Sequence, residues 1–322
     1  MKLKDRRFAA TAAAVFTAAL MLCASAQASA PLQKNQAPGY YRMTLGDFEV
    51  TALSDGIFPM EVNKMLANIS AKQLDSALAG SFLKEPVDTS VNGFLINTGS
   101  KLVLVDTGAG TNFGPTVGKL LSNLKASGYK PEQVDEIYIT HMHGDHVGGL
   151  LAGAKPAFPN AVVRASQSEA DFWLNKAHMD SAPADMKGAY QAAMNALNPY
   201  VSAGRFKSFD GDAELMPGIR ALAAAGHTAG HTVYVVESKG EKLVLWGDLM
   251  HVASVQFADP SVTILFDTDS AAAAAQRKKI FADAAAHGYW VAGAHLSFPG
   301  LGHLRAAGSG YEFVAANYGV PH

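Results

Sequence analysis

Short apolar runs alternate with turn-forming residues along most of the chain and predict a protein built from many strands. The runs are rich in β-branched and aromatic residues, and they predict strands at 48–54, 91–99, 101–108, 136–140, 161–166, 218–224, 231–238, 242–248 and 288–294. Apolar residues recur with helical spacing in four other stretches, which predicts helices at 114–127, 167–177, 184–196 and 271–286. The sequence SKGEK (238–242) predicts a hairpin turn between two of the strands.

The order of these elements indicates the fold class. Strands come first in hairpins, helices follow, and then strands return, so that the chain divides into two halves of similar design. Such a pattern favours two sheets packed on each other with helices on the outer faces. We therefore predict an α/β protein with a four-layer αββα sandwich.

The N-terminal segment follows a different pattern. A basic start and an apolar run precede small residues at alternate positions in SAQASA, which is typical of a secretory signal peptide. The apolar run is shorter than the roughly 20 residues that span a membrane, so a transmembrane anchor fits less well. We predict that residues 1–30 are removed after Ala26 or Ala28, and that residues 31–322 form one periplasmic or secreted domain without a membrane attachment.

Composition and charge limit the chemistry that is open to this domain. The formal net charge of −2 offers no basic field for nucleic acid, so no nucleic-acid partner is expected. Cys23 is the only cysteine and lies in the predicted signal peptide. A metal site would therefore have to use histidine and carboxylate ligands. The chain also lacks a G-x-S-x-G sequence for a serine nucleophile.

The stretch ITHMHGDHVGG (139–149) concentrates such ligands directly after a predicted strand. In an extended loop, His141 and His143 point the same way because side chains alternate with a period of two. Asp145 and His146 then turn to the other side as the chain bends. One short segment can thus offer two imidazoles to one metal ion and an Asp–His pair to a second.

Three more candidate ligands lie at or just past the ends of other predicted strands. They are His227 in AAAGHTAGHT, Asp248 in LVLWGDLMH and His295 in WVAGAHLSF. Strand ends are rigid, so ligands placed there are preorganised.

Together these residues resemble the motifs of the metallo-β-lactamase superfamily, from Gly93 to His295. The resemblance implies an αββα sandwich that holds two divalent metal ions, zinc being the expected metal. It implies that one ion is bound by His141, His143 and His227, the other by Asp145, His146 and His295, and that Asp248 bridges them. Asp106 in LVDTG would orient ligands from behind, or cap a turn, and His231 would be structural.

The resemblance also implies a hydrolase in which a hydroxide held between the two ions attacks an ester-like bond. Residues 245–270 are similar to methyl parathion hydrolase and its exported relatives, which act on aryl phosphotriesters, lactones and aryl esters. Acyl-homoserine lactonases, the main alternative, carry a tyrosine three residues after the bridging Asp, where this chain has His251. A non-catalytic metal-binding module is a further alternative.

The same comparison suggests catalytic and substrate-contacting residues. Asp145, Asp248 and His251 are the candidate catalytic residues, with His251 either donating a hydrogen bond to the oxyanion or leaving group, or simply packed. Phe113, Trp173 and Tyr190 occupy positions similar to that family's pocket aromatics, or are ordinary core residues. The expected partner is a small-molecule ester, lactone or organophosphate, and the sequence leaves a homodimer open.

Overall fold

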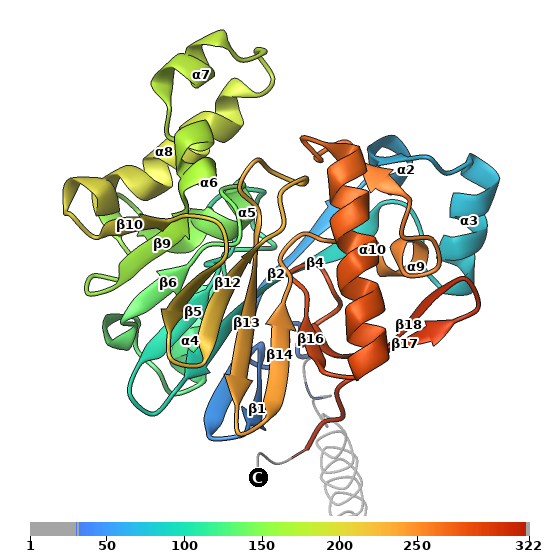
Figure 1. Ribbon diagram of the computed structural model, residues 1–322, viewed down its shortest axis with the longest axis horizontal. Coiled ribbons are helices and arrows are strands. Elements are labelled where there is room, and N and C mark those ends of the chain that lie inside the picture. The colour runs from blue at the N-terminus through green and yellow to red at the C-terminus, as the bar shows by residue number, and fades with distance from the viewer. Residues whose placement is uncertain (1–29, 31, 320–322) are drawn as a thin grey trace, which may run out of the picture. The chain divides into compact units, whose positions relative to one another are not determined.

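Two seven-stranded sheets lie face to face in this computed structural model, which describes residue 30 and residues 32–319 (Figure 1). In spatial order, the first sheet contains β1 (Tyr40–Leu45), β2 (Phe48–Met60), β4 (Val87–Asn97), β5 (Leu102–Val105), β6 (Glu136–Tyr138), β9 (Val162–Ser166) and β10 (Phe206–Phe209). The second contains β11 (Ala213–Met216), β12 (Ile219–Ala223), β13 (Thr232–Ser238), β14 (Glu241–Leu245), β16 (Trp290–Ala292), β17 (Leu301–Ala307) and β18 (Gly310–Ala315). Residues 1–29 of the predicted signal peptide lie outside the described part.

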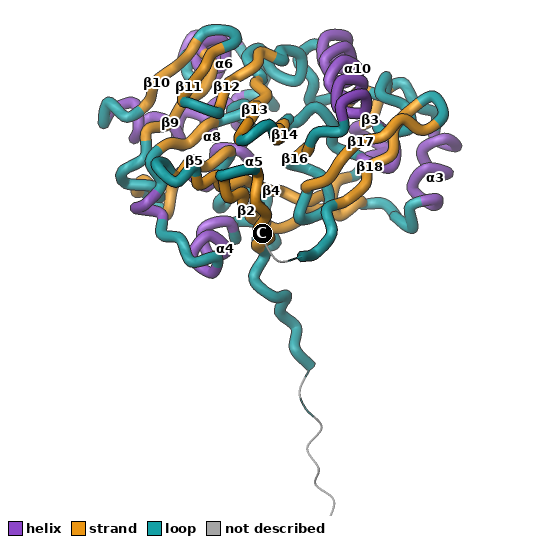
Figure 2. Tube along the Cα trace, turned by 60° about the horizontal axis from the view of Figure 1, so that its bottom comes forward, coloured by secondary structure: helices purple, strands orange, loops and turns teal. Residues whose placement is uncertain are grey.

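Helices cover the outer faces of the two sheets. The first sheet carries α4 (Leu120–Ala126), α5 (Gly144–Val147), α6 (Gln167–Trp173) and α8 (Lys187–Ser202), and α7 (Lys176–Ser181) packs on α6 and α8 beyond the sheet (Figure 1). The second carries α10 (Ser270–His287), and Figure 2 shows α4 and α10 outside their respective strands. Shorter elements in the connections are α2 (Val62–Met65), β3 (Leu66–Ala67), α3 (Ala71–Gly80), β7 (Leu151–Ala152), β8 (Lys155–Pro156), α9 (Ala253–Gln256) and β15 (Thr263–Ile264). The predicted four-layer sandwich is therefore confirmed.

The central strands are apolar where both of their faces are buried. In β5, Leu102 and Leu104 pack with the helices outside the first sheet, whereas Val103 and Val105 lie between the two sheets. The period-two alternation of a strand sends neighbouring side chains to opposite faces, so each run contributes to two cores at once. Strand β14 does the same, with Leu243 between the sheets and Val244 on the side that packs against α10.

The predicted strands and the 238–242 hairpin are all present, whereas several helix limits were wrong. The predicted helix 114–127 begins only at Leu120, because Asp55 accepts hydrogen bonds from the backbone N–H groups of Ala109, Gly118 and Leu120 and holds the preceding residues as a loop. The predicted helix 167–177 is two helices, since Asn175 caps the start of α7. Among the described residues, no helix is both long and apolar enough to cross a bilayer.

Candidate metal centre

Asp106, at the end of β5, holds the histidine-rich loop at two points. Its Oδ1 accepts the backbone N–H of Thr140 at 2.8 Å, and its Oδ2 accepts the Thr140 hydroxyl at 2.8 Å. The same Oδ2 lies 2.8 Å from His146 Nδ1. Because Nδ1 is engaged, the Nε2 atom of His146 is left as the free ring nitrogen, and the ring is held in one orientation.

The glycines after the motif are required by the close approach of two loops. A Cβ atom added to Gly149 would lie 1.9 Å from the carbonyl oxygen of Thr107, which is too close for any other residue. The Thr107 N–H and hydroxyl both donate to the carbonyl of His146 at 2.8 Å. The glycines thus let the loop after β6 pack against the loop after β5, and α5 starts with its polar residues turned toward the sheet edge.

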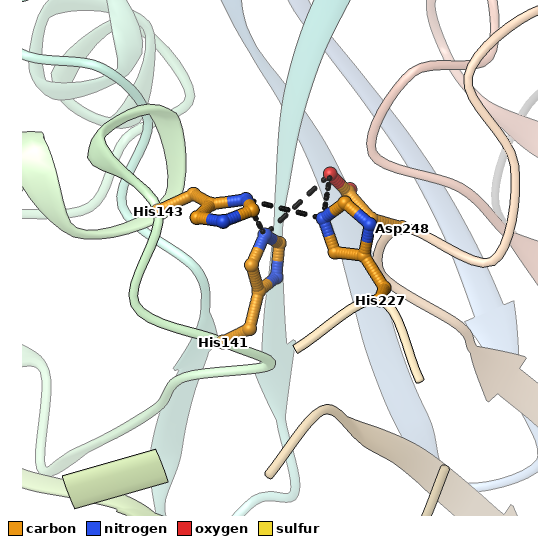
Figure 3. Close-up of side chains that lie close together, drawn as sticks. All are labelled: His141, His143, His227 and Asp248. Atoms are coloured by element: carbon orange, nitrogen blue, oxygen red, sulfur yellow. Dashed lines mark hydrogen bonds and ion pairs between the residues drawn. The ribbon is translucent and has the colours of Figure 1, made fainter. Parts of the chain in front are cut away.

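Four side chains from three loops form a first group (Figure 3). His143 Nδ1 lies 3.0 Å from His141 Nε2 and 3.1 Å from His227 Nε2. Asp248 Oδ2 lies 3.5 Å from His141 Nε2 and 3.4 Å from His227 Nε2. Ligand atoms bound tetrahedrally at ~2.1 Å from one ion are roughly 3.4 Å apart, so these spacings suit a shared metal ion.

A second group lies beside the first and shares Asp248 with it. Asp145 Oδ2 lies 3.6 Å from His146 Nε2 and 3.5 Å from His295 Nε2. The carboxylate of Asp248 reaches into this group as well, with Oδ1 3.2 Å from His146 Nε2 and Oδ2 3.1 Å from His295 Nε2. All seven side chains that the sequence singled out as ligands are therefore gathered at one place.

Buried polar atoms in both groups lack ordinary partners. His146 Nε2 and Asp248 Oδ1 are buried and make no hydrogen bond, although they lie 3.2 Å from each other. Burying such atoms without a partner costs free energy, and divalent metal ions are the partners that imidazole nitrogens and carboxylate oxygens share. The residues therefore fit the metal ions that the motif implies.

The charges in the site favour an ionised Asp248. Burial alone would raise the pKa of Asp248, but four buried imidazoles outweigh it and hold this pKa well below its usual range. These imidazoles belong to His146, His295, His141 and His251. The result is an anionic carboxylate between the two groups, as a shared ligand must be.

Further hydrogen bonds hold the histidine ligands through their second ring nitrogens, which point away from the two groups. His227 Nδ1 lies 2.9 Å from Asp267 Oδ1, and His295 Nδ1 lies 2.8 Å from the carbonyl oxygen of Ser90. Burial lowers the pKa of His227, but Asp248 and Asp267 raise it to about 9. His231 Nε2 accepts the backbone N–H of Asp248 at 3.0 Å, which supports the structural role expected for it.

Asp267 was missed in the sequence because nothing in its own neighbourhood marks it. It lies 40 residues from His227, on the loop between β15 and α10, and only the fold brings the two together. Carboxylates that accept the second ring nitrogen of a metal-binding histidine orient the ring and raise its basicity. Asp267 therefore has the position of an orienting residue.

His251 lies against the shared carboxylate, directly beside both groups. Its Nε2 is 3.1 Å from Asp248 Oδ2, and its ring stacks on that of His295 with centroids 5.1 Å apart. Burial lowers the pKa of His251 to about 4, so the ring is neutral at neutral pH. A neutral imidazole here can donate one N–H hydrogen bond but carries no charge.

A pocket of about 630 Å³ opens onto the two groups and is lined largely by aromatic and other apolar residues. Of the predicted pocket residues, Trp173 lies in its wall at 1% exposure and Phe113 at its mouth at 53% exposure. Tyr190 does not line it, which corrects the prediction, since its ring lies 4.8 Å from that of Trp173 and lines a separate hollow. Lining residues that the sequence did not indicate include Phe58, Met60, Phe172, Met186, Leu265 and Phe266.

Comparisons with known proteins agree with this architecture. A crystal structure of the hydrolase AbOPH of the beta lactamase superfamily has a TM-score of 0.85 and 38% identity, covering 89% of this chain and all of that one. AidC, a dizinc quorum-quenching lactonase in complex with a product, has a TM-score of 0.80 and 30% identity, covering 88% of this chain and 99% of AidC.

Similarity to curated sequences is more limited in extent. An N-acyl homoserine lactonase of Bacillus cereus is 27% identical over 161 residues, which is 50% of this chain. The chain spans only 56% of that relative's own length. The family model of the metallo-beta-lactamase superfamily, by contrast, matches residues 86–290, well over half of the chain. This match, the sandwich of two sheets and the grouped histidines and aspartates place the chain in the metallo-beta-lactamase superfamily.

Proposed function

We propose that this protein is an exported hydrolase with two divalent metal ions, zinc being the expected metal, that cleaves aryl esters, aryl-fused lactones or aryl phosphotriesters. The observation that carries this proposal is an aromatic pocket that opens directly onto two ligand groups sharing one carboxylate. Similarity to AbOPH, a hydrolase, and to AidC, a dizinc lactonase, supports it.

We assign the seven ligands to the two ions as the sequence motifs implied. His141, His143 and His227 would hold one ion and Asp145, His146 and His295 the other, with Asp248 shared. When bound, such a pair of ions polarises the oxygen of the substrate and supplies an ionised water near neutral pH.

The protein residues position the substrate and hold the protons in place. Asp248 is anionic and engaged on both sides, so its role is to fix the spacing of the two groups. His251 is neutral beside it and lines the pocket, and its Nε2, which lies 3.1 Å from Asp248 Oδ2, would have to turn its N–H from that carboxylate to donate to the oxygen that gains charge as the ester bond breaks. Asp145, the third predicted catalytic residue, acts as a ligand that faces the pocket.

Aromatic side chains give the pocket its preference for a flat leaving group. Phe58 and Phe113 stack on each other with ring centroids 5.5 Å apart, and Trp173 packs edge-on against His143 at 5.4 Å. An aromatic ring pair contributes about 0.5–1.5 kcal/mol beyond simple burial, or roughly three- to tenfold in kcat/KM. An aryl group beside the metal ions would gain from such contacts.

A second candidate is an N-acyl homoserine lactonase. The Bacillus cereus relative is named an N-acyl homoserine lactonase, and AidC is named a quorum-quenching lactonase. In addition, the flexible side chains of Met60, Met186 and Leu265 in the pocket wall could accept an acyl chain. The same metal centre would serve both reactions, so substrate preference separates the two candidates.

We expect metal-loaded protein to hydrolyse aryl esters, dihydrocoumarin-like lactones and aryl phosphotriesters with higher kcat/KM than long-chain homoserine lactones or a β-lactam. Phe113→Ala should lower kcat/KM for the aryl substrates about three- to tenfold, because it removes one aromatic contact. Steady-state kinetics across this panel, with metal content measured in parallel, checks both statements.

Phe82→Ala is the matched control for this experiment. Phe82 and Phe113 both have positive φ angles, 57° and 58°, but Phe82 is 97% exposed on the loop after α3 and is not among the residues lining the pocket. It should leave all rates unchanged. A preference of the wild-type protein for long-chain homoserine lactones, or equal behaviour of the two variants, would favour the lactonase candidate.

We further propose that the protein is exported and processed after Ala26 or Ala28, on the basis of the N-terminal sequence. Expression in a Gram-negative host should give periplasmic protein whose N-terminus begins at residue 27 or 29. Mass spectrometry of the intact chain measures this, and cytosolic protein that retains Met1 would contradict the proposal.

A further inference from the structure

Glu169, in the first turn of α6, is a fully buried carboxylate with three hydrogen-bond donors around it. Its Oε1 accepts the backbone N–H of Met142 at 2.8 Å. Its Oε2 accepts the Thr228 hydroxyl at 2.8 Å and the backbone N–H of Gly230 at 2.9 Å. The side chain has 0% exposure, and none of these donors is charged.

The two oxygens of Glu169 engage loops that belong to different sheets. Met142 stands between His141 and His143 on the loop after β6 of the first sheet. Thr228 and Gly230 directly follow His227 on the loop between β12 and β13 of the second sheet. One carboxylate therefore ties together the loops that supply all three histidines of the first group.

The rest of the first turn of α6 strengthens this connection. Ser166 Oγ donates to the carbonyl oxygen of Gly230 at 2.8 Å and accepts the backbone N–H of Glu169. A Cβ atom on Gly230 would lie 2.2 Å from Ser166 Oγ and 2.3 Å from the nitrogen of Glu169, so the loop can approach only as glycine. The end of the same helix presents Trp173 to the ring of His143.

We propose that Glu169 is a positioning residue that sets the distance between His143 and His227, and thereby the affinity of the first group for its metal ion. A carboxylate can accept from donors on both sides at once, which an amide of the same shape cannot. The inference rests on the proposed metal centre. Replacing a residue that orients metal ligands typically lowers metal affinity about 10- to 100-fold.

Glu169→Gln tests this directly. The amide must turn its NH₂ group toward either Met142 N–H or the two donors of the other loop, so one of the two loops loses its anchor. We expect the first-group ion to bind about 10- to 100-fold more weakly, while the second-group ion is retained. Chelator competition with cobalt- or zinc-loaded protein and elemental analysis measure this, with His143→Ala as the reference for loss of the first-group ion.

Ser166→Ala is the matched control, because it loosens the same helix turn but leaves both oxygens of Glu169 engaged. Both variants should lower the melting temperature of the metal-free protein, but Ser166→Ala, which loses one bond to Gly230 and keeps all three donors to Glu169, should weaken the first-group ion far less than Glu169→Gln does. Equal metal affinity in Glu169→Gln and wild type, or equal weakening in Ser166→Ala, would overturn the inference.

Two further results complete the test. If Glu169→Gln does not fold, Thr228→Val replaces it in the test, because this variant removes one donor and keeps the carboxylate. Thr228→Val should show a smaller loss of the first-group ion, and no loss of that ion would also overturn the inference. If the wild-type protein itself binds no metal ion tightly, the proposed metal centre fails, which is a separate outcome.

Discussion

Removal of the divalent ions with a chelator should abolish hydrolysis of every substrate in the panel and lower the melting temperature by about 10 °C. A ligand at 1,000 times its dissociation constant stabilises a fold by about 4 kcal/mol, and each kcal/mol corresponds to roughly 2–4 °C in a domain of this size class. Calorimetry and an ester assay on the same samples measure the two effects.

Readdition of zinc should restore both the activity and the melting temperature. Magnesium should restore neither, because it prefers oxygen ligands and the two groups are mostly imidazole. Full activity after exhaustive chelation would refute the assignment of a metal-dependent reaction, and the fold alone would then explain the similarity to known hydrolases.

Asp248→Asn should lower kcat/KM about a thousandfold and release at least one of the two ions. The shape of the side chain is kept, but the anionic charge that both groups surround is lost, and with it one shared ligand. Lewis-acid stabilisation by metal ions contributes several kcal/mol, which corresponds to about that factor in rate. Elemental analysis and steady-state kinetics check the two effects together.

Asp259→Asn is a suitable control for that substitution. Asp259 follows α9 on the same connection to α10, but it is exposed and its side chain accepts hydrogen bonds only from Ser261. It should keep both ions and full activity. An Asp248→Asn protein that still holds two ions would show that the carboxylate is not shared between them.

The sequence was most informative where burial or chemistry leaves few alternatives. Strand β5 and the last three residues of β14, Leu243–Leu245, are buried on both faces, so all of these residues are apolar, and turn formers bound each run. Histidine and aspartate clusters at strand ends are rare outside metal sites, so the positions of the candidate ligands could be predicted before the fold was known. Both signals are local in the chain.

Features that depend on tertiary contacts could not be predicted in the same way. Strands β17 and β18 carry exposed side chains at many positions, and their pairing with each other and with β16 makes them strands. Whether Tyr190 faces the pocket depends on the rotation of α8 against α6, where its ring packs behind Trp173. The roles of Asp267 and Glu169 could not be predicted because they depend on contacts between loops that are distant in the sequence.

Neither sheet carries a complete ligand set. His141, His143, Asp145 and His146 follow strands of the first sheet, whereas His227, Asp248 and His295 follow strands of the second. A nascent chain that has folded only its first half can therefore offer each ion no more than two ligands. On the proposed ligand assignment, metal binding would then be a late step in folding, because tight binding requires the docking of the second half. The metal supply at the place where folding ends, and not at the ribosome, would decide which element the protein carries.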